Sequence, residues 1–228
     1  MSGVHQLQRI GVVGDIHAED NYLQSALEFL ADSRLDLMMA VGDIADGRGS
    51  VDRCCQLLQQ YRVAAVAGNH ERWFLAEEAR DLPDSTPLDE VSSESRAYLS
   101  SLPKLLEYET VAGRLLLCHG LGGYDMGAVR PDDDEYALET NFALSLMLRE
   151  PKYKFIVNGH THRRMVRKID HLTIINAGTL FHEHRPCFLI ADFENESVQY
   201  YDLDCEARVS RAELIKLPAE TSVKIVID

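Results

Sequence analysis

The chain has 228 residues, of which 46% are hydrophobic and 26% are charged, and its formal net charge is −14 at pH 7. This apolar content can fill the core of one sizeable α/β domain, which argues against a disordered chain and predicts a single domain over residues 1–228. The acidic excess argues against broad binding of DNA or RNA, which needs a Lys/Arg face to neutralise phosphates. A small phosphorylated substrate stays compatible with this charge, since bound cations reverse the field locally.

The cysteines and the N-terminal residues bear on the compartment. The chain has five cysteines, Cys54, Cys55, Cys118, Cys187 and Cys205. An odd number without a repeated spacing argues against a disulfide framework and favours a reducing compartment. No apolar run approaches the ~18 residues of a membrane span, and the first residues lack the pattern of a signal peptide. We therefore expect a cytoplasmic protein with no membrane partner.

Short apolar runs recur along the chain, and each of them ends at a small or polar cluster. The runs are residues 8–13, 35–41, 63–67, 115–118, 155–157 and 172–175. Runs of this length, rich in Val, Ile and Leu, predict strands that are buried on both faces. Helical patterns with one apolar stripe lie between the first three runs, at 21–31 and 51–61. Strands that alternate with helices predict parallel βαβ units.

Two inserts interrupt this rhythm, at about 71–104 and 120–150. The first insert is polar and predicts two helices around a turn at 82–87. The second begins with a glycine-rich loop, contains the acidic run 132–135 and predicts a helix at 136–148.

The last part of the chain alternates apolar and polar residues. This alternation covers residues 187–193, 197–203 and 223–227, and a turn signal lies at 194–196. The pattern predicts antiparallel strands that complete the sheet structure.

The residues that follow the predicted strands are of metal-ligand type. They comprise two carboxylates, one amide and five imidazoles: Asp15, His17, Asp43, Asn69, His70, His119, His160 and His162. The carboxyl ends of parallel strands meet at one rim of a sheet, so we expect these side chains to lie together. Oxygen and nitrogen donors in combination suit Mn²⁺, Fe or Zn²⁺ better than Ca²⁺, which prefers oxygen alone. Each short motif occurs often by chance, and their combination is what predicts a metal centre.

Taken in order, these motifs resemble the calcineurin-like metallophosphoesterase superfamily. The matching blocks are Gly14-Asp15-Ile16-His17, Gly42-Asp43, Gly68-Asn69-His70-Glu71, His119-Gly120 and Gly159-His160-Thr161-His162. The resemblance covers roughly residues 15–162. It implies a four-layer α/β/β/α sandwich with two divalent or trivalent metal ions at one end of the sheets.

The resemblance also implies a role for each residue. One metal ion would bind Asp15, His17, Asp43 and His162, and the other would bind Asp43, Asn69, His119 and His160. Asp43 would bridge the two ions, and a water shared between them would attack the phosphate ester. Two such ions can activate the water and clamp the phosphate oxygens.

His70 is not a metal ligand in this superfamily. The resemblance implies that it protonates the leaving oxygen or stabilises charge on the phosphate, and a histidine pKa near the working pH suits either role. The alternative is a histidine that only packs behind the site.

Three arginines follow the motif blocks and could clamp phosphate oxygens. They are Arg48, Arg72 and Arg163. The alternative is that they are solvated surface arginines. Similarly, His182-Glu183-His184 could form a third metal site, but a solvated loop is the favoured interpretation.

The branch of the superfamily decides between substrates. Residues 42–49 resemble the Gly-Asp-x-x-Asp-Arg-Gly block of the protein-phosphatase branch, but Gly47 is inserted and Ala67 replaces the arginine that precedes Gly-Asn-His-Glu there. His162 and the turn Asn176-Ala177-Gly178-Thr179 are more similar to the phosphodiesterase branches. The leading hypothesis is therefore a phosphodiesterase acting on a small ester such as a nucleotide. A phosphomonoesterase or protein phosphatase is the alternative, and a scaffold that kept the fold without the chemistry is a third.

Overall fold

The computed structural model describes residues 6–149 and 151–217. Its strands are β1 Arg9–Val13, β2 Leu37–Ala40, β3 Ala64–Ala65, β4 Leu105–Thr110, β5 Gly113–Cys118, β6 Phe155–Asn158, β7 Met165–Ile169, β8 Leu172–Asn176, β9 Cys187–Asp192, β10 Ser197–Leu203 and β11 Val209–Lys216. Its helices are α1 Asp20–Ala31, α2 Val51–Gln60, α3 Asn69–Ala76, α4 Ser93–Ser101, α5 Glu135–Glu139 and α6 Phe142–Arg149, with a 3₁₀ helix η1 at Leu88–Glu90.

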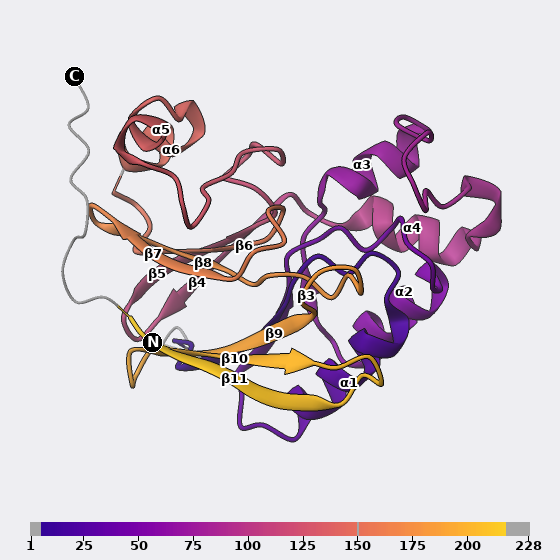
Figure 1. Cartoon of the computed structure of the whole chain (residues 1–228), viewed down its shortest axis with the longest axis horizontal. Helices are drawn as coiled ribbons and strands as arrows, with labels where there is room; N and C mark the ends of the chain where they lie inside the picture. The colour runs from indigo at the N-terminus through magenta and orange to yellow at the C-terminus, as the bar shows by residue number, and fades with distance from the viewer. Residues whose placement is uncertain (1–5, 150, 218–228) are drawn as a thin grey trace, which may run out of the picture.

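The strands form two sheets that pack face to face (Figure 1). One sheet has the order β11-β10-β9-β1-β2-β3, and the other has the order β4-β5-β6-β8-β7. Strands β1, β2 and β3 pair in parallel with α1 and α2 between them, which confirms the predicted βαβ units. Strands β5, β6 and β8 also pair in parallel, whereas the strands that flank each parallel set are antiparallel to it.

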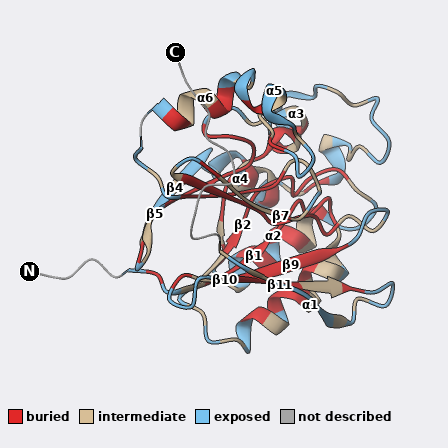
Figure 2. Ribbon diagram, turned by 60° about the vertical axis from the view of Figure 1, so that its left-hand side comes forward, coloured by how far each residue is buried: buried red, intermediate tan, exposed pale blue. Residues whose placement is uncertain are grey.

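Three groups of buried apolar side chains separate four layers. The first joins α1, α2 and α4 to the six-stranded sheet and includes Leu27 and Phe188. The second lies between the sheets and includes Val12 and Leu117, and the third joins α5 and α6 to the five-stranded sheet and includes Leu144. Figure 2 shows the buried residues concentrated in the two sheets and on the helix faces turned toward them. The predicted four-layer α/β/β/α sandwich is confirmed.

The continuous apolar runs reflect strands that serve two layers at once. In β5, Leu115 and Leu117 point between the sheets while Leu116 points toward the helices. In β8, Ile175 and Ile174 divide in the same way. Successive side chains of a strand face opposite sides, so a strand that is covered on both faces carries apolar residues at nearly every position. Each such side chain, when fully buried, contributes about 1.5–3 kcal/mol to the hydrophobic term.

Three strands lie outside the sequence prediction: β4, β7 and β11, each at an edge of its sheet. Edge strands carry polar side chains on the solvent side, and Glu107 and Glu109 of β4 are examples. Such strands lack the continuous apolar run by which the central strands were found. The predicted strand at 223–227 lies outside the described residues.

The inserts fold largely as expected. The two helices predicted for residues 71–104 are α3 and α4, and α3 begins two residues earlier, at Asn69. The helix predicted at 136–148 is divided into α5 and α6, because the Asn141 side chain accepts a hydrogen bond from the backbone N–H of Leu144 (3.0 Å) and starts a second helix there. Within the described ranges, no helix is both long and apolar enough to cross a lipid bilayer.

The two sheets approach closely where β1 ends. The carbonyl of Asp15 accepts hydrogen bonds from the Thr179 hydroxyl (2.8 Å) and the Leu180 N–H (2.9 Å), in the segment that leads from β8 to β9. A Cβ atom at Gly14 would lie 2.1 Å from the carbonyl oxygen of Gly178. Only glycine therefore allows this contact between the chain segments that carry the sheets.

We expect Gly14→Ala to lower the free energy of unfolding by about 1–3 kcal/mol, because the added methyl group forces backbone atoms apart. Urea denaturation of the purified protein measures this loss. Gly123→Ala is the matched control, since a Cβ atom at Gly123 has no heavy atom within 4 Å. Equal stability of the two variants would show that the segments can move apart without cost.

Candidate functional site

The structure brings all eight residues of the predicted set to one end of the sandwich. The six-stranded sheet supplies Asp15, His17, Asp43, Asn69 and His70 from the segments that follow β1, β2 and β3. The five-stranded sheet supplies His119, His160 and His162 from the segments that follow β5 and β6. The site therefore lies on the seam between the two sheets.

The backbone at the site takes unusual conformations. His17, Asp43, His160 and His162 all have positive φ angles, of 47°, 47°, 66° and 57°. Non-glycine residues seldom adopt this left-handed region, and each such residue costs of order 1 kcal/mol or more. Four of them among the predicted ligands indicate that the strand-end loops are held in place to aim side chains.

The ligand-type atoms form two groups that share one residue. Across the described ranges, the groups are His17–Asp43–His162 and Asp43–His119–His160, with the potential ligand atoms of each within 4.8 Å of one another. The shared residue, Asp43, is the one that the resemblance predicts to bridge two ions. The Asn69 side-chain oxygen lies beside the second group, 3.0 Å from the His160 Nδ1 atom.

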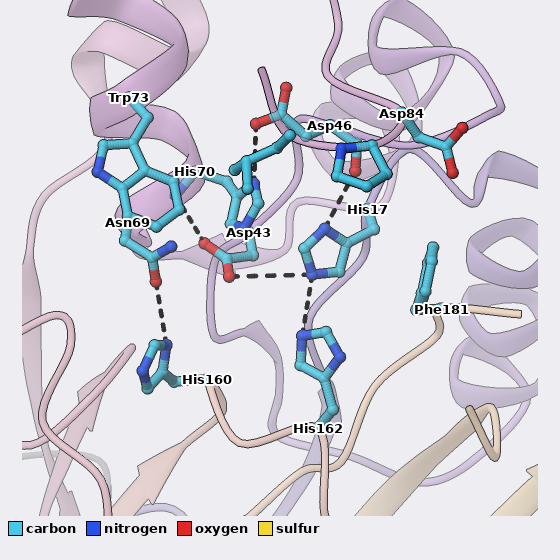
Figure 3. A pocket seen from close by; sticks show the side chains of 12 residues that line it. His17, Asp43, Asp46, Asn69, His70, Trp73, Asp84, His160, His162 and Phe181 are labelled. Atoms are coloured by element: carbon cyan, nitrogen blue, oxygen red, sulfur yellow. Dashed lines mark hydrogen bonds and ion pairs between the residues drawn. The ribbon is translucent and has the colours of Figure 1, made fainter. Parts of the chain in front are cut away.

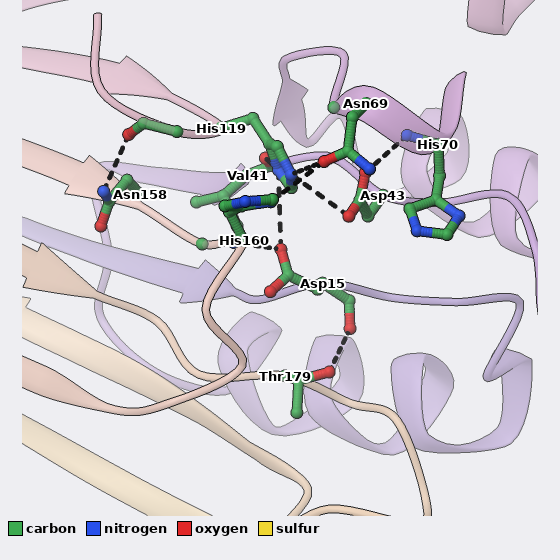
Figure 4. A network of polar contacts seen from close by, with 12 residues as sticks. Asp15, Val41, Asp43, Asn69, His70, His119, Asn158, His160 and Thr179 are labelled. Atoms are coloured by element: carbon green, nitrogen blue, oxygen red, sulfur yellow. Dashed lines mark hydrogen bonds and ion pairs between the residues drawn. The ribbon is translucent and has the colours of Figure 1, made fainter. Parts of the chain in front are cut away.

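The contacts of the His119 ring show that the Asp43–His119–His160 group needs a positive charge (Figure 4). Its Nδ1–H donates to the carbonyl oxygen of Val41 (2.8 Å). Its Nε2 faces the side-chain oxygen of Asn69 at 2.9 Å and the carboxylate of Asp43 at 3.2 Å. Burial would lower the pKa of His119, but the carboxylates of Asp43 and Asp15, together with the hydrogen bond to Val41, raise that pKa to about 10. A neutral ring would set a lone pair against two oxygens, so the geometry requires either a proton or a metal ion at this point.

On the other side of Asp43, His17 and His162 also direct ring nitrogens toward a common point. The His17 Nδ1–H donates to the carbonyl oxygen of Asp46 (3.0 Å), and its Nε2 lies 3.0 Å from the Nε2 of His162. Burial lowers the pKa of both rings, and that of His162 falls to about 3. Two neutral rings aimed at a common point are suited to hold a cation between them.

Asp15 carries an unpaired buried oxygen. Its side chain is fully buried, and Oδ1 accepts a hydrogen bond from the N–H of His160 (2.9 Å). Its Oδ2 has no hydrogen-bond partner in the part of the chain that the structure describes, and the Nε2 of His162 lies 3.6 Å from it, beyond hydrogen-bond distance. Burial raises the pKa of Asp15 to about 7. Because an unpaired buried carboxylate oxygen is costly, this atom fits a metal ion well, and the mixed nitrogen and oxygen donors fit Mn²⁺, Fe or Zn²⁺.

Glu71 holds two of the loops together, a role that was not predicted. This buried carboxylate accepts hydrogen bonds from the N–H groups of Ile44 (2.6 Å) and Ala45 (2.9 Å), just after Asp43, and from that of Gly68 (2.7 Å), just before Asn69. It therefore fixes the distance between the Asp43 and Asn69 loops. Its place in the Gly-Asn-His-Glu block was the sequence signal available for it.

His70 stands apart from both ligand groups and is oriented by Asp46. The His70 Nδ1–H donates to the Asp46 carboxylate (2.8 Å), which also accepts hydrogen bonds from Arg80 (2.7 and 3.0 Å) and from the N–H of Thr86 (2.9 Å). Burial acts to lower the pKa of His70, but the hydrogen bond to Asp46 and the negative charges of Asp43, Asp46 and Glu71 together raise that pKa. Arg80 and Thr86 carry no motif and were not predicted.

A pocket of about 350 Å³ opens over this cluster (Figure 3). It is lined by His17, Asp43, Asp46, Asn69, His70, Trp73, Leu82, Pro83, Asp84, His160, His162 and Phe181. The predicted phosphate clamps do not reach it. Instead, Arg48 pairs with Glu183 (2.9 Å), Arg72 with Asp125 (2.7 Å) and Arg163 with Asp132 (2.6 Å). The structure places these arginines as the alternative interpretation describes, in exposed ion pairs.

Comparison with known proteins identifies the family. A family model described as the calcineurin-like phosphoesterase superfamily domain matches residues 9–196. The chain belongs to this superfamily. The resemblance seen in the five motif blocks is thus confirmed, and the structure contains His and Asp groups that could bind metal, in keeping with a metal-dependent family.

Solved structures share the fold of this superfamily member. A metallophosphoesterase from Sphaerobacter thermophilus superposes with a TM-score of 0.65 at 19% identity, over 87% of this chain and 89% of that one. An archaeal protein described as a novel phosphodiesterase superposes with a TM-score of 0.54 at 15% identity, over 86% and 99% of the two chains. At these identities the likeness establishes the fold.

A sequence relative resembles one part of the chain. Serine/threonine-protein phosphatase 2 of Escherichia coli (strain K12) is 45% identical over 73 residues, which are 31% of this chain and 33% of that protein. The curated relatives are matched over only about a third to a half of their own length, 33% and 48%.

The His182–His184 segment is an exposed loop, as expected, and its two histidines contact residues outside the loop. The His182 ring is hydrogen-bonded to the carboxylate of Glu19, and the Nδ1 of His184 lies 2.8 Å from the Nδ1 of His162. For the Nε2 of His162 to offer a lone pair to a cation, its proton must sit on Nδ1, where His184 accepts it. His184 therefore fixes both the tautomer and the orientation of His162.

We expect His184→Ala to weaken Mn²⁺ binding about tenfold or more, the usual cost of losing the partner of a metal-binding histidine. Calorimetric titration of the metal-free protein measures the affinity, and only the binding step on the His17–His162 side should change. Arg185→Ala is the control, because this neighbour in the same loop has 82% of its side chain exposed. Unchanged Mn²⁺ binding in His184→Ala would remove this role.

Proposed function

We propose that this protein is a dinuclear-metal phosphodiesterase that hydrolyses a small phosphodiester. The observation that carries the proposal is the pair of ligand groups sharing Asp43, together with the unpaired buried Oδ2 of Asp15. Asp15, His17, Asp43 and His162 would hold one cation, and Asp43, Asn69, His119 and His160 the other. When bound, two such ions supply an activated water and neutralise charge on the phosphate.

The chain's own residues then have separate tasks. His70 lines the pocket, and Asp46 fixes its Nδ1–H, so its Nε2 is the atom that can give a proton to the leaving oxygen. Burial lowers the pKa of His70, but the hydrogen bond to Asp46 and the neighbouring carboxylates raise it overall. The raised pKa favours a ring that is protonated when substrate binds. Burial alone would raise the pKa of Asp46, but the hydrogen bonds from His70, Arg80 and Thr86 lower that pKa to about 2. Arg80 thus helps to keep Asp46 ionised and oriented.

The charges of the pocket favour a diester over a monoester. Among the described residues, no Lys or Arg lines the pocket, whereas Asp43, Asp46 and Asp84 do. Arg80 pairs with Asp46 (2.7 Å) and Arg48 pairs with Asp84 (3.3 Å), so both of these arginines are already engaged by carboxylates. A monoester carries nearly two negative charges at neutral pH, and a diester carries one. Apart from two metal ions, the pocket would offer no further cationic side chain from the described residues to balance the second charge of a monoester. The name of the archaeal structural neighbour, a phosphodiesterase, agrees with this choice.

One observation favours the alternative, a phosphomonoesterase or protein phosphatase. A serine/threonine-protein phosphatase is 45% identical to this chain over 73 residues, and Asp46 of the Gly-Asp-x-x-Asp region pairs with His70. That pairing serves leaving-group protonation in either reaction. It therefore supports the chemistry more than the choice of substrate, and a scaffold without activity has no need of it.

Relative activity on two substrates with one leaving group separates these functions. With Mn²⁺ supplied, we expect kcat/KM for bis(p-nitrophenyl) phosphate to exceed that for p-nitrophenyl phosphate at least tenfold. His119→Ala is the control and should lose both activities, because His119 belongs to the Asp43 group. A preference for the monoester would instead establish the phosphatase, and no hydrolysis with Mn²⁺, Fe²⁺, Ni²⁺ or Zn²⁺ would favour the scaffold.

His70→Ala should leave metal content intact and lower kcat by about 10²–10⁴-fold, the usual contribution of a general acid. The loss should be largest for esters of alcohols, which leave poorly without a proton, and smaller for p-nitrophenyl esters. Metal analysis and kcat over a series of leaving groups measure this. Loss of bound metal, or an equal loss for every leaving group, would contradict the assignment of His70 as the proton donor.

A further inference from the structure

Two aromatic side chains belong to the pocket although no motif includes them. Trp73 lies three residues after His70 and four after Asn69 on α3, so the helix turns its ring to the same face as these two side chains. Phe181 lies in the segment that crosses from β8 to β9. Both rings are half-buried and line the pocket, so each presents apolar surface to whatever binds there.

The two rings flank opposite halves of the site. Trp73 packs against His70, with ring centroids 5.0 Å apart, and Phe181 packs against His17, with centroids 5.5 Å apart. Figure 3 shows Trp73 on the Asn69 side of Asp43 and Phe181 on the His17 and His162 side. A phosphate held at Asp43 would thus have an aromatic ring on either side of it.

We propose that Trp73 and Phe181 bind the two organic groups of the substrate, Trp73 the group that leaves and Phe181 the group that stays on the phosphate. This proposal rests on the phosphodiesterase function and deepens it. Because His70 protonates the leaving oxygen and Trp73 packs on His70, the leaving group lies against Trp73. The remaining ester group then falls on the opposite side, against Phe181.

The chemistry of these walls selects flat groups. An aromatic face binds another ring by stacking, whereas a glycerol or sugar group offers no such face. Leu82 and Pro83 add further apolar surface to the pocket. The substrate class is therefore a diester that carries an aromatic ring on both sides of the phosphate, and nucleoside esters are the biological compounds of this kind.

Three p-nitrophenyl diesters test the assignment because they share one leaving group. They are bis(p-nitrophenyl) phosphate, the p-nitrophenyl ester of thymidine 5′-monophosphate, and p-nitrophenyl methyl phosphate, whose retained group has no ring. With the Mn²⁺-loaded full chain, Phe181→Leu should lower kcat/KM about tenfold for the first two, the effect of losing one stacking contact, and less than about twofold for the methyl ester. Trp73→Leu should lower kcat/KM about equally for all three.

Two controls separate stacking from damage to the site. Phe142→Leu replaces an aromatic residue that is 63% exposed and outside the pocket lining, and it should leave all three rates unchanged. Phe181→Tyr keeps the ring and should keep the wild-type order of substrates. Mn²⁺ affinity is measured for each variant, because Phe181 also touches His17 and His162.

The outcomes distinguish this proposal from the function on which it rests. Hydrolysis of none of the diesters by the wild-type protein would remove the phosphodiesterase function itself. Normal wild-type hydrolysis with an equal loss for all three esters in Phe181→Leu would overturn the assignment of Phe181 alone. A second measurement uses only the wild-type protein and so does not depend on the folding of a variant. Thymidine 5′-monophosphate should inhibit hydrolysis at least about tenfold more strongly than methyl phosphate. Equal inhibition by the two compounds would also overturn the proposal.

Discussion

The central constraint on the site is that several of its buried oxygen and nitrogen atoms receive no hydrogen bond from the described part of the chain. The Oδ2 of Asp15 lacks a hydrogen-bond partner among the described residues, and the Nε2 of His119 faces oxygens of Asn69 and Asp43. Leaving buried polar groups unpaired costs roughly 1–3 kcal/mol each, and more for a charged oxygen. No lysine or arginine among the described residues lines the pocket to compensate them. Cation binding is therefore coupled to the stability of this rim, because ions that bind only the folded chain stabilise it by mass action.

The sandwich is what makes this concentration possible. The six-stranded sheet contributes the carboxylates and the amide, and the five-stranded sheet contributes His119, His160 and His162. Neither sheet carries a complete group, because each group combines Asp43 with histidines from across the seam. The close approach of Gly14 to Gly178 and the three hydrogen bonds of Glu71 fix the seam and the loops on it. Core packing and ligand geometry are thus set by the same contacts.

Sequence patterns predicted the parts of the molecule in which the signal is local. Buried central strands such as β1 and β6 appear as continuous apolar runs, and ligand-type residues follow them closely. Edge strands β4, β7 and β11 were not predicted because polar residues interrupt their apolar runs. The pairing of Asp46 with Arg80, 34 positions away, follows from the fold alone, as does the meeting of His162 with His184. Spacing along the chain predicted three arginines at the site, but each is drawn into an ion pair with a nearby carboxylate that the sequence could not locate in space.

These arginines bear on how an acidic protein binds an anion. The chain carries a formal charge of −14, and the pocket presents Asp43, Asp46 and Asp84 to an incoming phosphate. Two arginines reach carboxylates of the pocket lining, Arg80 at Asp46 (2.7 Å) and Arg48 at Asp84 (3.3 Å), and both are engaged in these ion pairs. Without metal ions the pocket would repel a phosphate ester, and bound cations would reverse the sign of its field. Substrate affinity should then follow metal occupancy, and what remains to discriminate between esters is the uncharged part of the lining. The apolar side chains of the lining are Trp73, Leu82, Pro83 and Phe181, so selection among phosphate esters falls to apolar and aromatic contact.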